Sequence, residues 1–149
     1  MATHAAIDDF VSQKTFALVG VSRGGKKFGN SLLRQLGGRY QLYAVHPEAT
    51  SIDGVACYRS LQHLPGPVDG VIIVVPPAQT EAVVRDALAA GIKRVWMQQG
   101  AESTDAIRFC EKNGMSCIAG HCLFMFADAK HFPHSWHRGV LRLFGKLPK

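Results

Sequence analysis

The sequence lacks the features of a secreted or membrane-spanning protein. Its first residues, MATHAAIDDFVSQ, place Asp8 and Asp9 where a signal peptide is apolar, and no apolar run approaches the roughly 20 residues that cross a bilayer. Only four cysteines occur, and no two of them show CxxC spacing. We therefore expect reduced thiols and a cytoplasmic protein.

Charged residues are also few, at 19% of the 149 residues against 47% hydrophobic residues, a composition that excludes intrinsic disorder. The length fits one domain whose core needs no disulfide or metal. Acidic residues are fewer than basic residues, because the sequence has 11 Asp and Glu and 17 Lys and Arg, which gives a net charge of +6. This surplus favours an anionic partner such as a phosphorylated small molecule, nucleic acid or membrane headgroups.

Short apolar runs alternate with amphipathic segments along the chain. The apolar runs predict strands over residues 17–19, 40–45, 71–75, 94–97 and 116–119. The amphipathic segments predict helices over residues 7–12, 30–36, 77–90 and 103–113, and glycine follows the last three of these. The connection over residues 48–67 is irregular, with one short helix expected within residues 58–64.

The order of these elements predicts the fold. The run at residues 71–75, VIIVV, has no polar alternation and is typical of a parallel strand covered on both faces. Right-handed crossovers then give a single α/β, Rossmann-like domain over residues 1–149, with an open parallel sheet of about five strands and helices on both faces. In such a sheet, ligands bind beyond the carboxyl ends of the strands.

The turn after the first strand reads GVSRGGKKFGNS, residues 20–31. It has neither the GxGxxG nor the GxxxxGK[ST] pattern, so it gives no support for nucleoside triphosphate hydrolysis. Its glycines allow a phosphate to approach the backbone, and the helix that follows offers free N–H groups. Basic side chains concentrate around it, namely Arg23, Lys26, Lys27 and Arg34. The turn predicts a phosphate site, with a glycine-rich surface loop as the alternative.

The turn after the second strand lacks an acidic residue. A dinucleotide site places Asp or Glu there to bind the ribose, whereas this chain has His46 and Pro47. This weakens NAD as the ligand and leaves NADP open, with a capping or solvent-facing residue as the alternative for His46. The third turn, Val75-Pro76-Pro77, is apolar and stiff, and suits the face of an adenine ring or the simple initiation of a helix.

Three segments together carry a family resemblance: FALVGVSRGGKKFGNSLLRQL, then YAVHPEATSIDGVACYRSLQHLPGPVDGVIIVVPPAQTEAVVRDALAAGIKRVWMQQGAES, then GMSCIAGHCL. They lie in this order over roughly residues 14 to 126. The chain resembles the small stand-alone CoA-binding domain proteins, which are similar to the CoA-binding domain of succinyl-CoA synthetase α-subunits. Members of that family often have Asn where this chain has His46.

The resemblance implies a site for coenzyme A. It places Gly20, Val21, Ser22 and Lys27 near the phosphates, Val75 and Pro76 against the adenine, and His46, Pro47, Gln99 and Gly100 along the rest of the cleft. Stand-alone members lack the ligase and phosphohistidine machinery of the synthetase, and nothing in this sequence supplies it. We therefore expect a protein that binds CoA or an acyl-CoA without an evident catalytic set.

Two further groups of residues were weighed as reactive or metal-binding. Cys122, beside His121, can in principle form a mixed disulfide with CoA or accept an acyl group, but a buried, inert thiol is the favoured interpretation. His131, His134 and His137 form HxxHxxH, and we favour a solvated surface over a metal site. The sequence thus predicts no catalytic residue and no metal ligand.

Residues 127–149 form a basic C-terminal extension that we expect to pack on the domain or on a partner. The expected ligand is a small molecule, with neither nucleic acid nor membrane insertion, while a protein partner or a homodimer stays open. Two other functions remain as alternatives. One is an NAD(P)-binding protein or small reductase; the other is a nucleic-acid or membrane-surface module that uses the basic extension.

Overall fold

Strands and helices alternate through residues 4–21, 28–37, 39–52 and 54–123, which the computed structural model describes. The strands are β1 (Thr15–Val19), β2 (Gln41–Val45), β3 (Ser51–Ile52), β4 (Val55–Tyr58), β5 (Gly70–Ile73), β6 (Arg94–Gln98) and β7 (Ser116–His121). The helices are α1 (His4–Val11), α2 (Phe28–Leu36), the 3-10 turn η1 (Leu61–His63), α3 (Pro77–Ala89) and α4 (Thr104–Lys112). Each expected strand and helix is present, with ends within a few residues of the prediction.

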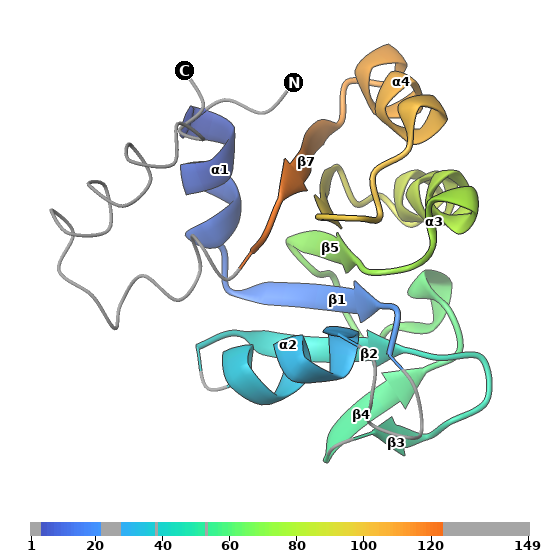
Figure 1. The fold of residues 1–149 in the computed structure, drawn as a ribbon. Coiled ribbons are helices and arrows are strands. Elements are labelled where there is room, and N and C mark those ends of the chain that lie inside the picture. The colour runs from blue at the N-terminus through green and yellow to red at the C-terminus, as the bar shows by residue number, and fades with distance from the viewer. Residues whose placement is uncertain (1–3, 22–27, 38, 53, 124–149) are drawn as a thin grey trace, which may run out of the picture.

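The strands form one sheet in the order β3-β4-β2-β1-β5-β6-β7 (Figure 1). All neighbours are parallel except β3, which runs antiparallel to β4. The Rossmann-like α/β fold is therefore confirmed, but the sheet has seven strands rather than about five. The two additional strands, β3 and β4, form a short hairpin in the stretch expected to be irregular. Gly54, with φ of +78°, supplies the turn between them.

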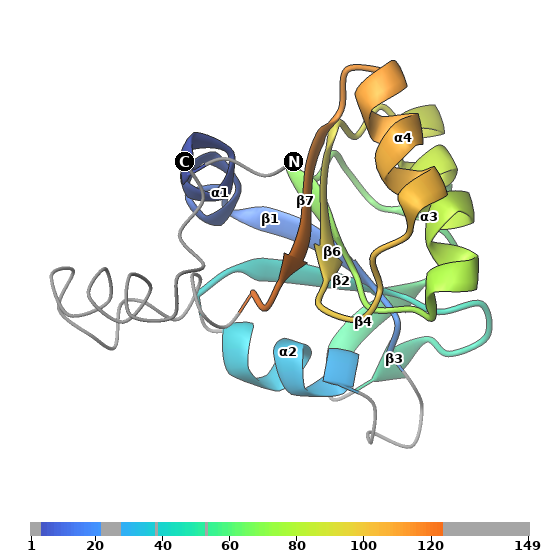
Figure 2. The same ribbon diagram turned by 45° about the horizontal axis from the view of Figure 1, so that its top comes forward.

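Helices cover both faces of the sheet, as expected (Figure 2). Apolar side chains of α1 and α2 pack on one face, in a cluster that includes Phe10, Leu32 and Trp96. Those of α3 and α4 pack on the other face, in a cluster that includes Val84 and Cys110. The central strand β5 is buried at all four residues, which explains why its sequence has no polar alternation.

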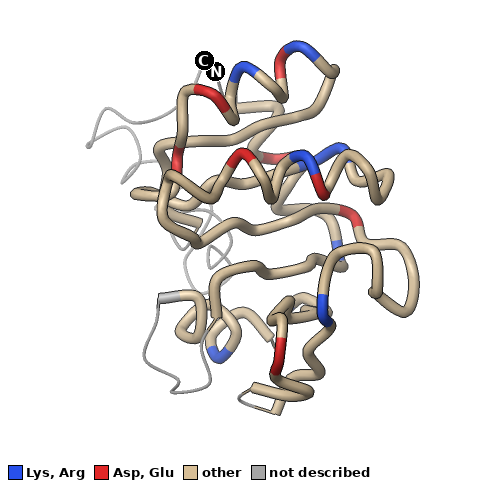
Figure 3. Tube along the Cα trace, turned by 90° about the vertical axis from the view of Figure 1, so that its right-hand side faces the viewer, with Lys and Arg blue, Asp and Glu red and all other residues tan. Residues whose placement is uncertain are grey.

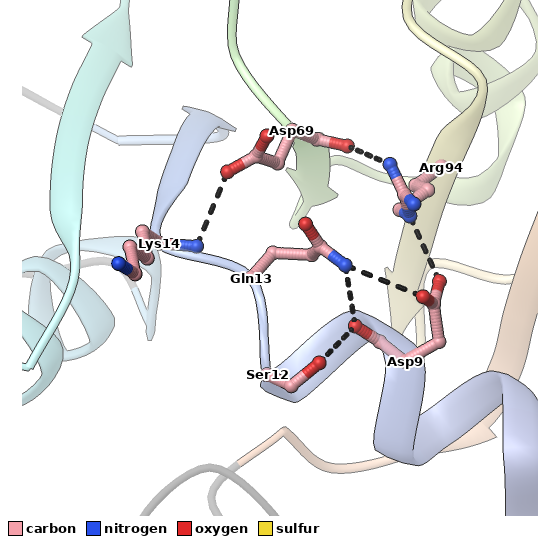
Figure 4. Close-up of polar contacts among 6 residues, drawn as sticks. All are labelled: Asp9, Ser12, Gln13, Lys14, Asp69 and Arg94. Atoms are coloured by element: carbon pink, nitrogen blue, oxygen red, sulfur yellow. Dashed lines mark hydrogen bonds and ion pairs between the residues drawn. The ribbon is translucent and has the colours of Figure 1, made fainter.

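The amino ends of β1, β5 and β6 are held by polar side chains, drawn in Figure 4. Arg94 donates from Nε to Asp9 Oδ2 at 2.8 Å, which links β6 to α1. Asp69 Oδ2 accepts the backbone N–H groups of Lys14 at 3.2 Å and Thr15 at 3.1 Å, which links the start of β5 to the start of β1. We call this end of the sheet the amino edge, and the opposite end the carboxyl edge.

The charges are balanced within the part of the chain that the structure describes, which contains nine basic and nine acidic residues. Both signs alternate along α3 and α4 (Figure 3). The excess positive charge therefore belongs to other segments of the sequence. Residues 22–27 contain three basic residues, and residues 124–149 contain five basic residues and one acidic residue. None of the helices described is both long and apolar enough to cross a membrane.

Candidate functional site

The carboxyl edge contains the topological switch point of the sheet, where successive connections run to opposite sides. The chain leaves β1 toward β2 on one side and leaves β5 toward β6 on the other side, because β1 and β5 are neighbours at the centre of the sheet. The helix after β1 covers one face and the helix after β5 covers the other. In sheets of this kind, ligands bind between such diverging connections.

Close backbone packing shapes the first of these connections. Gly20 follows β1 with φ of +125°, and a Cβ atom built on it would lie 2.3 Å from the carbonyl oxygen of Val74. A Cβ atom on Gly29, in the first turn of α2, would lie 2.4 Å from the carbonyl oxygen of Gly20. Any side chain would force the backbone apart at both positions. The start of α2 therefore lies directly against the end of β1, while the Val21 side chain is buried in the core.

His46, after β2, organises its own turn. Its Nδ1 atom accepts the backbone N–H groups of Glu48 at 3.1 Å and Ala49 at 3.0 Å, and its backbone N–H donates to Tyr58 O at 2.9 Å. These bonds assign the ring hydrogen to Nε2 in the neutral imidazole. An Asn side chain makes the same kind of turn with its carbonyl oxygen. The capping role considered for His46 is thus present, and Pro47 beside it is exposed.

The third connection contains Val75, which is half-buried, and Pro76, which is exposed and precedes α3. Thr80, in the first turn of α3, is fully buried and donates from Oγ1 to the carbonyl oxygen of Ala101 at 2.6 Å. This bond joins α3 to the turn after β6. The apolar pair after β5 is therefore held in a fixed position relative to the neighbouring turn.

The last residue of β6, Gln98, is buried, and the two residues that follow it are exposed. Gln98 is 3% exposed, and its Oε1 atom accepts the backbone N–H of Leu123 at 3.0 Å, which links β6 to the end of β7. Gln99 and Gly100 are exposed. The backbone N–H of Gly100 donates to Glu102 Oε2 at 2.8 Å. That N–H group is consequently already occupied by a carboxylate.

The structure brings most of the expected site residues to the carboxyl edge. Those that it describes there are Gly20, Val21, His46, Pro47, Val75, Pro76, Gln99 and Gly100. Ser22 and Lys27 lie outside the described residues, as do Arg23 and Lys26. Arg34 lies in the last turn of α2, and its Nη2 atom donates to Ser31 Oγ at 3.5 Å, so its side chain contacts the last residue of the segment 20–31.

Sequence reasoning missed three residues that shape this edge: Gly29, Thr80 and Gln98. Each makes its contact with a backbone atom that is distant in the sequence, at Gly20, Ala101 and Leu123 respectively. Gln98 is a polar residue directly after the apolar run at residues 95–97, and this position in the sequence could have indicated its role. A buried Thr in a helix gave no comparable indication.

The remaining candidates add little to this site. Cys122 is partly exposed at the end of β7, and the carbonyl oxygen of His121 accepts the Trp96 Nε1–H at 3.1 Å. His131, His134 and His137, and the extension at residues 127–149, lie outside the described residues. In the residues that are described, no group of three His, Cys, Asp or Glu side chains is arranged to hold a metal ion.

A hollow of about 380 Å³ lies far from these residues, near the C-terminal end of α3, and Leu61, Val68 and Ile92 are among its lining residues. It contains none of the expected site residues. The carboxyl edge is the candidate site because topology, glycine packing and helix N-termini coincide there.

Comparison with solved structures supports the fold. A conserved protein from Pyrococcus furiosus is 40% identical with a TM-score of 0.70, and the match covers 74% of this chain and 96% of that one. A protein from Pyrococcus horikoshii is 26% identical to this chain, with a TM-score of 0.77. The match covers 87% of this chain and 92% of the Pyrococcus horikoshii protein. Both are small proteins of similar extent to this chain.

Comparison of sequences supports the family. The α-subunit of an ADP-forming acetate–CoA ligase from Pyrococcus furiosus is 28% identical over 131 residues, which are 78% of this chain but only 28% of the relative. This chain therefore spans less than a third of that protein's length. The sequence pattern of the family described as CoA binding domain matches residues 14–128. Because that match covers all seven strands and every helix except α1, the chain belongs to the CoA-binding domain family.

Proposed function

We propose that this protein binds coenzyme A or an acyl-CoA at the carboxyl edge, with the diphosphate against the turn between β1 and α2. The observation that carries the proposal is the backbone packing of Gly20 and Gly29. Neither position can hold a side chain unless the backbone moves, so the start of α2 lies directly against the end of β1, and the positive end of a helix at a strand end favours phosphate. Membership of the CoA-binding domain family supports CoA as the phosphate-bearing ligand in this proposal.

The adenine of CoA would lie against Val75 and Pro76. This pair offers an apolar surface on which Pro76 has no backbone N–H group. The bond from Thr80 to Ala101 fixes the helix that follows. The face of the flat purine ring can pack on such a surface, while its polar edge groups stay free to bond elsewhere. Gln99 and Gly100 would line the cleft beside it, with the Gly100 N–H already used by Glu102.

His46 favours CoA over NAD in this proposal. An NAD site uses a carboxylate after the second strand to accept hydrogen bonds from the ribose hydroxyl groups. Here Nδ1 of His46 already accepts two backbone N–H groups, so the ring offers a ligand only the Nε2–H donor. A donor suits a phosphate oxygen and does not replace the missing acceptor. CoA carries a ribose 3′-phosphate in addition to its diphosphate, so this preference agrees with CoA.

The basic residues of segment 22–27 would supply charge for these phosphates, with Ser22 and Lys27 as the contacts. We propose binding without catalysis, since the ligase activity belongs to a relative of which this chain spans 28%. The protein would then sense or carry CoA or an acyl-CoA, or deliver it to a partner. Its expected setting is the cytoplasm, where CoA ligands and reduced thiols are found together.

Calorimetry and chemical unfolding test this proposal. Free CoA at 100 times its dissociation constant should raise the free energy of unfolding by about 2.7 kcal/mol. NAD(H) and NADP(H) at the same concentration should raise it less. Stabilisation by NADP(H) but not by CoA would refute the assignment.

Replacing Lys27 tests where the phosphates bind. Lys27→Ala should weaken CoA binding by about 1.5–3 kcal/mol, the contribution of a hydrogen bond to a charged group. Lys93→Ala is the matched control, because Lys93 is exposed at the amino edge, just before β6. It should leave the CoA affinity unchanged. Equal affinity in the Lys27 variant and the wild type would move the phosphates away from this turn.

A further inference from the structure

One arginine of the described chain lies at the end of a strand on the carboxyl edge. Arg59 directly follows β4, and its side chain is exposed. The other Lys and Arg residues of the described ranges lie within helices or at the amino edge. They are Lys14, Arg34, Arg39, Arg85, Lys93, Arg94, Arg108 and Lys112. Among the described residues, Arg59 is therefore the Lys or Arg that the sheet itself brings to the candidate site.

The end of β4 lies beside the end of β2. Val45 and Tyr58 are register partners in these parallel strands, and the backbone N–H of His46 donates to the carbonyl oxygen of Tyr58 at 2.9 Å. That carbonyl group belongs to the peptide unit that joins Tyr58 to Arg59. His46 and Arg59 are consequently neighbouring positions, each the first residue beyond its strand.

Both positions belong to the side of the sheet that α2 covers. Ala49, whose backbone N–H donates to His46 Nδ1 at 3.0 Å, packs against the cluster of α1 and α2. Cys57 of β4 is buried in the same cluster, and the alternation of side chains along a strand makes Arg59 the next residue on that side. The turn between β1 and α2 leads to the same side. The two residues therefore share one side of the carboxyl edge with the proposed diphosphate site.

Arg59 and His46 both have donor groups left for a ligand. No acidic side chain of the described ranges forms an ion pair with Arg59, whereas Arg85 contacts Glu81 Oε2 at 2.7 Å. The His46 ring has its Nε2–H group, since Nδ1 already accepts two backbone N–H groups. A guanidinium group presents paired donors that match two oxygens of one phosphate. The imidazole N–H beside it adds a further donor.

We propose that Arg59 and His46 bind the phosphomonoester on the ribose of CoA, its 3′-phosphate, and thereby select CoA over 3′-dephospho-CoA. This inference rests on the proposed function, which puts the diphosphate at the turn after β1. β2 is adjacent to β1 and β4 lies one strand further, so the two strand ends are about 5 and 10 Å from that of β1. In CoA a single ribose separates the 3′-phosphate from the diphosphate. The order of the strand ends therefore matches the order of the phosphate groups.

Calorimetric titration of the full chain with CoA and with 3′-dephospho-CoA tests this proposal. The wild type should bind CoA about tenfold more tightly than 3′-dephospho-CoA, the effect of one hydrogen bond to a charged group. Arg59→Ala should lose this preference, because its affinity for CoA falls about tenfold while its affinity for 3′-dephospho-CoA stays the same. Arg59→Gln, which keeps most of the side chain without the charge, should behave as Arg59→Ala does.

Arg108→Ala is the matched control. Arg108 is also exposed, lies in the middle of α4, and contributes the same charge to the protein. Its replacement should leave both affinities unchanged. An equal loss of CoA affinity in this variant would show a general effect of net charge. Equal weakening of both ligands by Arg59→Ala would separate Arg59 from the 3′-phosphate. Either result would overturn the proposal.

The wild type distinguishes this inference from the proposed function. Equal affinity for CoA and 3′-dephospho-CoA would overturn the inference and leave CoA binding intact, whereas binding of neither ligand would refute the proposed function itself. NADP and NAD form a second pair of probes, because NADP carries its phosphomonoester at the ribose 2′ position. A preference for NADP over NAD that depends on Arg59, in a protein that does not bind CoA, would assign the phosphate site to NADP instead.

Discussion

The two edges of the sheet are built from different parts of the polypeptide. At the amino edge, charged side chains connect the elements, as Arg94 does with Asp9 and Asp69 does with the start of β1. At the carboxyl edge, backbone atoms meet directly at Gly20 and Gly29. The amino edge therefore depends on which side chains are present. At its first turn, the carboxyl edge depends on the absence of side chains at these two glycines.

The helices have a corresponding asymmetry. α2, α3 and α4 all begin at the carboxyl edge, where each follows the end of a strand. The partial positive charge of a helix N-terminus favours anions, so three such ends contribute to the potential there. The last turn of α3 lies at the amino edge, beside the start of β6. A substitution at the amino edge should therefore change the stability of the fold alone, whereas a substitution at the carboxyl edge should change ligand binding as well.

Gly20→Ala should have the largest effect. The new Cβ atom would lie 2.3 Å from the Val74 carbonyl oxygen at a φ of +125°, so the backbone must shift. We expect a loss of about 3 kcal/mol in the free energy of unfolding, together with loss of CoA binding. Urea unfolding and calorimetry measure the two effects.

Gly91→Ala is the matched control for this substitution. Gly91 also has a positive φ, of +80°, but nothing lies within 4 Å of a Cβ atom built there. It should cost only the conformational strain of about 1 kcal/mol and leave CoA affinity intact. If both variants lose the same stability and both bind CoA, the close approach of Gly20 to Val74 is unimportant.

Asp69→Ala should have an intermediate effect that is confined to stability. It removes the acceptor for the backbone N–H groups of Lys14 and Thr15 at the exposed amino edge. Water can replace part of this interaction, so we expect a loss of about 1.5 kcal/mol in the free energy of unfolding. CoA affinity, measured by calorimetry on the folded variant, should not change. A tenfold or greater loss of affinity would show that the two edges are coupled.

Tyr40 should give the smallest effect, visible in alkaline solution. Its hydroxyl donates to the Val11 carbonyl oxygen at 2.7 Å, and burial raises the pKa of Tyr40 above its ordinary value despite the neighbouring Arg39. The neutral hydroxyl therefore stabilises the fold below a pH of about 10, and this contribution of about 1 kcal/mol is lost as the pH rises through the higher pKa of the folded state.

Urea unfolding from pH 8 upward compares Tyr40→Phe with the wild type. The variant should be less stable at pH 8 and lose less stability than the wild type as the pH rises. Tyr43→Phe is the control, because Tyr43 accepts a hydrogen bond from Gln41 on β2 and lies outside this contact. It should keep the alkaline loss of the wild type. Parallel curves for the wild type and Tyr40→Phe would contradict the role assigned to Tyr40.

Most of the fold could be predicted because apolar runs and helix ends are local properties of the sequence. The β-branched run that became β5 and the glycine after α3 are examples. The hairpin of β3 and β4 was missed, although Asp53-Gly54 is a recognised hairpin sequence, because its strands are only two and four residues long. Such short strands show no periodicity, so only the turn residues indicate them.

The candidate site was predictable to the level of turns but not of individual contacts. Strand ends and glycines located the carboxyl edge, with Gly20 and His46 among the predicted residues. Gly29 and Thr80 contact backbone atoms that the fold brings near them, so no local pattern in the sequence could predict these contacts. Arg34 lies within α2 rather than before it, and the sequence did not show that its side chain bonds to Ser31 Oγ. Segment 22–27 and the C-terminal extension remain predictions.

The two-residue strand β3 has a consequence for how the molecule behaves at high concentration. An uncovered strand at the border of a sheet has unpaired backbone N–H and C=O groups. A strand of another chain can pair with these groups, which is a common route to fibrils. Here the parallel array ends in a strand of two residues that runs in the opposite direction. So short a stretch gives an incoming segment little to align with. The hairpin thus makes this border of the sheet a poor template for a second copy of the chain.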